Sequence, residues 1–76
     1  MNDKTPALAK QLIKVQADIK FGRLPETSRE ASIKAITDEG HLHSISKNEI
    51  LTAAINNGEI YKAELEKTHG VLYVDK

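Results

Sequence analysis

The sequence predicts a small α+β domain of three helices followed by a C-terminal β-hairpin, and three observations lead to this fold class. An amphipathic pattern from Thr5 to Lys20 is typical of a helix, a capping sequence at Ser46 begins another, and the apolar period changes from helical to alternating after Gly58. We therefore expect the order helix, helix, turn, helix, strand, strand. The domain spans residues 1–76, with residues 1–4 frayed.

The first helix is predicted from its start signal and its apolar stripe. Thr5 is expected to cap the helix and Pro6 to occupy its first position, where the missing amide costs nothing. The apolar residues of the stripe recur at helical spacing and are Leu8, Leu12, Val15 and Ile19. The stripe lasts about two heptads, so core packing is the expected use, and a helix pair across a dimer is the alternative.

The second helix follows a connector, residues 21–26, in which Gly22 and Pro25 close the first helix. Residues 27–30 (TSRE) have the spacing of a capping box, and the helix is expected to end near residues 38–40. The next segment, residues 41–45, is interpreted as a short strand or as a loop that places Leu42 and Ile45 in the core.

The third helix and the hairpin come from the last thirty residues. Ser46 and Glu49 form a second capping box, with Ile50, Leu51, Ala54 and Ile55 on the apolar face and Gly58 as a left-handed stop. Residues 61–66 alternate like a strand with one buried face, residues 67–70 form a turn, and residues 71–74 (VLYV) form the second strand. The alternative is a helix that continues through residues 61–66.

Composition excludes several classes of protein. The 76 residues contain no cysteine, so a disulfide framework and a thiolate zinc site are absent. A chain of this length buries only about 60% of its unfolded surface, so dimerisation would stabilise it. No glycine-rich phosphate loop is present, and the serines and threonines stand at capping positions, so we expect neither an enzyme nor a cofactor. No apolar run suggests a membrane helix or a signal peptide, so a cytoplasmic location is expected.

His41 and His43 are candidate metal ligands because of their spacing. On a strand, this spacing points both imidazoles to one face, as metal ligands can be. Further ligands would have to come from His69, Asp38 and Glu39, which are candidates by residue type only. Two histidines in a polar turn are more often solvated, and we predict no biological metal.

A resemblance to a known family rests on residues 54–63 (AINNGEIYKA) and the strand at residues 71–75 (VLYVD). These segments resemble the winged helix-turn-helix modules of excisionase and MerR type, in which a recognition helix ends at a glycine and a short hairpin follows. The chain departs from that pattern by lacking arginines in the wing, by a longer turn between the second and third helices, and by Tyr61 where proline is common.

The resemblance implies DNA binding by the helix from Lys47 to Asn57. Its exposed residues would read or position bases, and they are Lys47, Asn48, Thr52 and Asn56. Lys67 and His69 would touch phosphate. Because residues 35–76 carry four basic against seven acidic side chains, the DNA surface would have to recruit basic residues of the first helix and its connector. Those residues are Lys10, Lys14 and Arg23.

The sequence therefore leaves two functions open. The first is a small non-enzymatic DNA-binding accessory or regulatory protein, of the kind found among phage, plasmid or bacterial regulators. The second is a protein-protein interaction module or inhibitor that binds no nucleic acid, through the stripe of the first helix or the edge of the strand at residues 71–74. Both are compatible with a homodimer.

Overall fold

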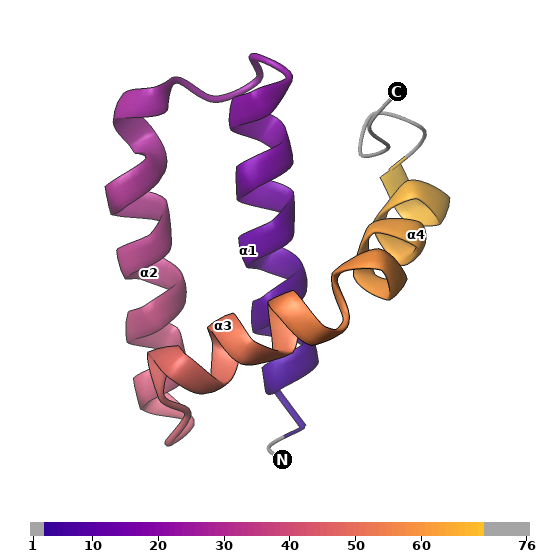
Figure 1. Cartoon of the computed structure of the whole chain (residues 1–76). Coiled ribbons are helices and arrows are strands. Elements are labelled where there is room, and N and C mark those ends of the chain that lie inside the picture. The colour runs from indigo at the N-terminus through magenta and orange to yellow at the C-terminus, as the bar shows by residue number, and fades with distance from the viewer. Residues whose placement is uncertain (1–2, 70–76) are drawn as a thin grey trace.

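The computed structural model describes residues 3–69, and every regular element in that range is helical (Figure 1). The elements are α1 (Thr5–Lys20), a 3-10 turn (Glu26–Ser28), α2 (Arg29–Leu42), α3 (Lys47–Asn56) and α4 (Gly58–His69). The predicted α+β class is wrong, because a fourth helix occupies the residues assigned to the first strand. The second strand, at residues 71–74, falls outside the described residues.

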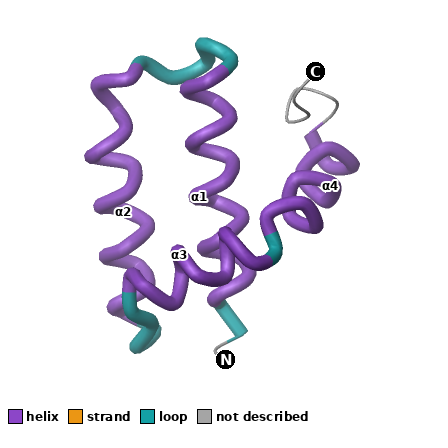
Figure 2. Tube along the Cα trace, viewed as in Figure 1, coloured by secondary structure: helices purple, strands orange, loops and turns teal. Residues whose placement is uncertain are grey.

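The helices are arranged around α1, which packs against each of the other three (Figure 1). α1 and α2 run antiparallel, α3 crosses them near the N-terminal end of α1, and α4 lies on the other side of α1 from α2 (Figure 1). Figure 2 shows that the connections are short, and that only a brief break separates α3 from α4. Helices α2 and α4 thus pack on opposite sides of α1.

The start of α1 differs from the prediction. Lys4, not Thr5, is the N-cap residue, and no side-chain hydrogen bond caps the helix there. The Thr5 side chain is fully buried, and its hydroxyl donates a hydrogen bond to the Glu49 carboxylate at 2.6 Å. Thr5 therefore ties the first turn of α1 to the first turn of α3.

The end of α1 confirms the prediction that Gly22 closes the helix. Gly22 has φ of 78°, the left-handed conformation that glycine adopts without steric cost. The Gly22 N–H donates to the Ile19 carbonyl at 3.2 Å, and the Arg23 N–H donates to the Asp18 carbonyl at 2.7 Å. This is the Schellman pattern, which satisfies carbonyls left without partners at a helix end.

The end of α2 uses the same pattern without a glycine. Ser44 takes the left-handed conformation with φ of 61°, and its N–H donates to the His41 carbonyl at 3.1 Å. The Ile45 N–H donates to the Gly40 carbonyl at 2.7 Å. The predicted end near residues 38–40 is therefore too early, since α2 continues to Leu42.

Gly40 is a packing position inside α2. A Cβ atom there would lie 2.8 Å from Ile50 Cδ1 and 3.2 Å from the Ile45 carbonyl oxygen. The absence of a side chain lets α3 and the loop before it approach α2 closely. The glycine that the sequence offers as a helix stop is therefore used for close approach.

The third helix begins as predicted, whereas the capping box predicted at residues 27–30 is wrong, because its expected cap residue, Thr27, lies within the 3-10 turn. Ser28 precedes α2 without a capping hydrogen bond from its side chain. Ser46 Oγ accepts a hydrogen bond from the Glu49 N–H at 3.1 Å and caps α3. The Glu49 carboxylate, which the capping box would send back to Ser46, instead accepts from Thr5.

The fourth helix replaces the predicted strand because of the spacing of its apolar residues. Tyr61 and Leu65 are buried, and Ala63 between them is exposed. Two residues four positions apart lie on one face of a strand and also on one face of a helix, so Tyr61 and Leu65 are compatible with both structures. Gly58 begins α4 and does not take the left-handed conformation, and the turn predicted at residues 67–70 is helical as far as His69.

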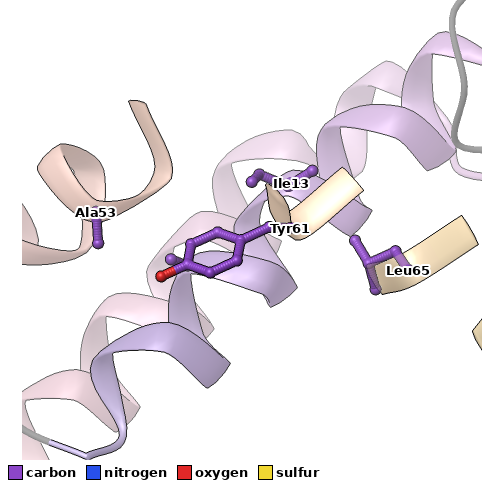
Figure 3. Close-up of a cluster of buried hydrophobic side chains, with 5 residues drawn as sticks. Ile13, Ala53, Tyr61 and Leu65 are labelled. Atoms are coloured by element: carbon purple, nitrogen blue, oxygen red, sulfur yellow. The ribbon is translucent and has the colours of Figure 1, made fainter. Parts of the chain in front are cut away.

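The core consists of two clusters of buried apolar side chains. The first, here called the α2–α3 cluster, contains Leu8, Leu12, Ile36, Ile45 and Ile50. The second, the α4 cluster, contains Ala9, Ile13, Ala53, Tyr61 and Leu65. Figure 3 shows the Tyr61 ring lying over α1 and pointing toward Ala53. The predicted core position of Ile45 is confirmed, but Leu42 is 83% exposed.

Candidate binding groove

A hollow of about 460 Å³ opens where α1, the end of α3 and the start of α4 meet. Its apolar wall is formed by buried or half-buried side chains of α1 and α3, which are Leu12, Ile13, Leu51 and Ala54. Its rim carries the side chains of Gln16, Asn56, Asn57, Glu59 and Lys62. We call this hollow the groove.

Two exposed isoleucines stand beside the groove and line it. Ile55, on α3, is 80% exposed, and Ile60, on α4, is 58% exposed. Single exposed apolar residues are normal on a protein surface, but these two line the same apolar hollow and so add exposed apolar surface to it. Ile55 was predicted on the buried face of the third helix, and its exposure corrects that prediction.

The corner between α3 and α4 creates this exposed apolar surface. The Asn57 N–H donates to the Ala53 carbonyl at 3.0 Å, and the Asn57 carbonyl accepts from the Tyr61 N–H at 2.9 Å. The Asn57 side-chain amide also donates to the Ala53 carbonyl, at 3.3 Å. One residue therefore ends α3 and begins α4, and the change in direction turns Tyr61 onto α1 while leaving Ile55 and Ile60 in solvent.

The charges at the rim of the groove nearly cancel. Glu59 Oε1 and Lys62 Nζ lie 3.8 Å apart, one turn from each other on α4. The other polar side chains of the rim, within residues 3–69, are neutral amides. The groove therefore favours an apolar ligand surface without a large net charge.

The residues predicted to read DNA are placed on one element. Lys47, Asn48, Thr52 and Asn56 all lie on α3 and are all exposed. Lys67 lies near the far end of α4, and His69 is the last residue of that helix. The turn between α2 and α3 contains four residues, 43–46, and is shorter than the sequence predicted because α2 extends to Leu42.

The basic residues of α1 and its connector that were predicted to contribute to a DNA surface form ion pairs with carboxylates. Lys10 forms an ion pair with Glu64 of α4. Lys14 Nζ and Arg23 Nη2 each lie 3.0 Å from a carboxylate oxygen of the buried Asp18. The Lys10 pair joins α1 to α4, the Lys14 pair lies within α1, and the Arg23 pair joins the connector to α1. The strand predicted at residues 61–66 gave no indication of the pairing between Glu64 and Lys10.

The histidine pair lies in a helix end and not in a strand. His41 is in the last turn of α2, and His43 is the C-cap residue. Within residues 3–69, no three or more side chains of the types that bind metals come together. Nor does that part of the chain contain a helix with the length and apolar character needed to span a membrane.

Over residues 3–69, the chain is an all-α domain with an apolar hollow at the corner between two helices. Comparison with protein-family models, curated proteins and solved structures finds no significant match to this chain.

Proposed function

We propose that this chain is a non-enzymatic protein-interaction module that docks a partner through the groove. The observation that carries the proposal is the pair of exposed isoleucines beside the apolar hollow, Ile55 at 80% and Ile60 at 58% exposure. Burying an isoleucine side chain fully is worth about 1.5–3 kcal/mol, so covering the two provides a substantial driving force for association. The cytoplasm is the proposed compartment, on the sequence grounds given above.

The shape of the groove favours an amphipathic helix as the docked element. Helix-in-groove recognition uses apolar side chains at successive turns that enter a hydrophobic groove. The apolar wall of the groove, which includes Leu12 and Ala54, provides such a surface. The neutral amides of the rim can form hydrogen bonds with polar groups at the edges of the docked helix. A small ligand would leave Ile55 largely in solvent, because that side chain is 80% exposed.

DNA binding is the second candidate, favoured by one observation. The four-residue turn between α2 and α3 is of the length found in helix-turn-helix motifs, and α3 presents Lys47, Asn48 and Thr52 to solvent. We rank it second because non-specific DNA affinity comes from basic side chains that neutralise phosphates. Lys10, Lys14 and Arg23 are instead paired with carboxylates.

Selection from a displayed library of helical peptides tests the first proposal. We expect enriched peptides with apolar residues at successive helical turns, and we expect Ile55→Ser to abolish their binding. Leu42→Ser is the matched control, because Leu42 is equally exposed, at 83%, but does not line the groove. Failure to enrich any peptide, or equal binding by both variants, would contradict the proposal.

Fluorescence anisotropy with mixed-sequence duplex DNA tests the second candidate. If α3 reads DNA, binding at low salt weakens steeply as salt is added, and Lys47→Ala reduces the salt dependence. Absence of binding at low salt would eliminate DNA reading by the isolated chain.

A further inference from the structure

We infer that the partner that covers the groove is a second copy of this chain, in a two-fold symmetric dimer. The inference rests on the proposed function, because it uses the same surface and names its occupant. Three properties of the described residues point to self-association: the shape of the patch, the placement of its charges and the nature of its amides.

The shape of the patch is self-complementary. A two-fold interface brings the same surface of both copies together, so that surface must contain both a projection and a recess that accepts it. Ile55 and Ile60 project, and the hollow lined by Leu12 and Leu51 is recessed beside them. In a two-fold pairing, Ile55 of each copy enters the hollow of the other.

The charged side chains of the rim would pair with those of a second copy whose α4 runs antiparallel. Glu59 and Lys62 lie one turn apart on α4, and both are exposed. Two α4 helices that cross antiparallel about a two-fold axis place Glu59 of each copy opposite Lys62 of the other. Opposite charges then meet twice, and the formal net charge of +0 adds no overall repulsion between copies.

The neutral side chains of the rim fit the same arrangement. Gln16 and Asn56 line the groove, and each carries an amide that both donates and accepts hydrogen bonds. Amides therefore pair with their own kind across a symmetric interface, whereas a rim of one charge sign would repel its copy. Among the described residues of the rim, a partner with a strongly charged surface would find one carboxylate and one ammonium group as counter-charges.

Sedimentation of the full chain from low micromolar to near-millimolar concentration is the first test. We expect a reversible monomer–dimer equilibrium. Each substitution in a two-fold interface acts twice, so Ile55→Ser should raise the dimer dissociation constant about a hundredfold or more. Leu42→Ser should leave the dissociation constant unchanged, and circular dichroism should show the same helicity in all variants.

A charge-reversal experiment tests the antiparallel pairing. The variant with Glu59→Lys and the variant with Lys62→Glu should each dimerise more weakly, by roughly tenfold, because like charges face each other. An equimolar mixture of the two should restore dimers, since each copy then faces the opposite sign. Restoration in the mixture cannot come from repair of a folding defect in either variant.

The outcomes separate the dimer from the proposed function. A chain that stays monomeric at every concentration but binds a selected helical peptide through Ile55 overturns self-association and leaves the interaction function in place. A monomer that selects no peptide overturns both. A dimer unaffected by Ile55→Ser, or a mixture that stays as weak as its components, overturns the groove as the site of self-association.

Discussion

The two sides of α1 carry cores of different construction. The α2–α3 cluster joins Leu8 and Leu12 to three isoleucines, one each from α2, the loop before α3, and α3. The α4 cluster contains two alanines, Ala9 and Ala53, and among the described side chains α4 contributes Tyr61 and Leu65 to it. Within the described part of the chain, large aliphatic side chains from several segments thus hold the first three helices together, whereas α4 is held by two of its own side chains.

The difference indicates that α4 is the least stable unit of the described chain. Hydrophobic stabilisation scales with apolar area removed from water, and small alanine partners offer less of it. The additional contacts of α4 with α1 are made by the half-buried Lys10, which pairs with Glu64 and whose Nζ lies 5.8 Å from the centre of the Tyr61 ring. Contacts of this kind contribute about 0.5–1 kcal/mol each, so α4 can open while the other helices stay folded.

The largest effect is expected in the α2–α3 cluster. Ile50 is 2% exposed, and its truncation in Ile50→Ala leaves a cavity against Leu8 and Gly40. The free energy of unfolding should fall by about 2–5 kcal/mol, measured by urea denaturation. Amide exchange should accelerate in α1, α2 and α3 together, because Ile50 belongs to the cluster that joins these three helices. Acceleration confined to α3 would contradict the cooperative unit assigned to α1, α2 and α3.

Removing the ring of Tyr61 should act more locally. Tyr61→Ala is expected to cost about 2 kcal/mol, below the usual range for a buried aromatic residue, because α4 detaches and leaves no enclosed cavity. Hydrogen exchange should rise in α4 and stay protected in α1–α3. Tyr61→Phe, which keeps the ring, serves as the control. If Tyr61→Ala unfolds all helices at once, the separation of the two regions is wrong.

The buried hydroxyl of Thr5 strengthens the first region by tying α1 to α3. Thr5→Val keeps the shape of the side chain and removes its hydrogen bond to Glu49. A hydrogen bond to a charged group is worth about 1.5–3 kcal/mol, and we expect the lower end because Glu49 is only half-buried. Thermal denaturation measures the loss. An unchanged stability would show that the hydroxyl and the carboxylate are equally well satisfied by water.

The cap of α3 contributes a smaller amount to the same region. Ser46→Ala removes the acceptor for the Glu49 N–H and should lower the free energy of unfolding by about 1 kcal/mol. Ser28→Ala is the control, because Ser28 precedes α2 without a capping hydrogen bond and its loss should have little effect. Equal losses in the two variants, measured by urea denaturation, would contradict this difference.

The smallest effect concerns the exposed pair Glu26 and Arg29, outside both clusters. The bidentate hydrogen bond from Arg29, at 2.7 and 3.0 Å, holds the pKa of the Glu26 carboxyl below its ordinary value. A lowered pKa in the folded state stabilises the fold above the unfolded pKa, and that contribution disappears as pH falls through the folded pKa. Carboxyl NMR titration should show the pKa of Glu26 rising toward its ordinary value in Arg29→Gln.

Local chemistry made part of the fold readable from the sequence. The range of α1 follows from its apolar stripe, its end follows from Gly22, and the start of α3 follows from Ser46. In each case the deciding pattern or hydrogen bond involves residues that are close to one another in the sequence. The outward position of Lys47, Asn48, Thr52 and Asn56 follows from the helical period in the same way.

The end of α2 depended on packing between helices. Gly40 has the residue type of a helix stop, but the approach of Ile50 uses it inside α2, and Ser44 takes the left-handed position instead. Likewise, Thr5 has the type of a cap, but the nearness of Glu49 makes it a tie between helices. A glycine or a threonine at a helix end can serve that end or contact another helix. Which of the two occurs depends on residues that are distant in the sequence, here Ile50 and Glu49.

The helical state of residues 58–69 and the groove were decided in the tertiary structure. Tyr61 and Leu65 satisfy the period of a strand and the spacing of a helix equally, so the local pattern contained no deciding information. The surface of α1, with Ala9 and Ile13, accepts both side chains from one face of a helix. That packing sets the corner at Asn57, and the corner leaves Ile55 and Ile60 exposed beside the hollow, because a side chain's burial depends on neighbours that lie far away in the sequence.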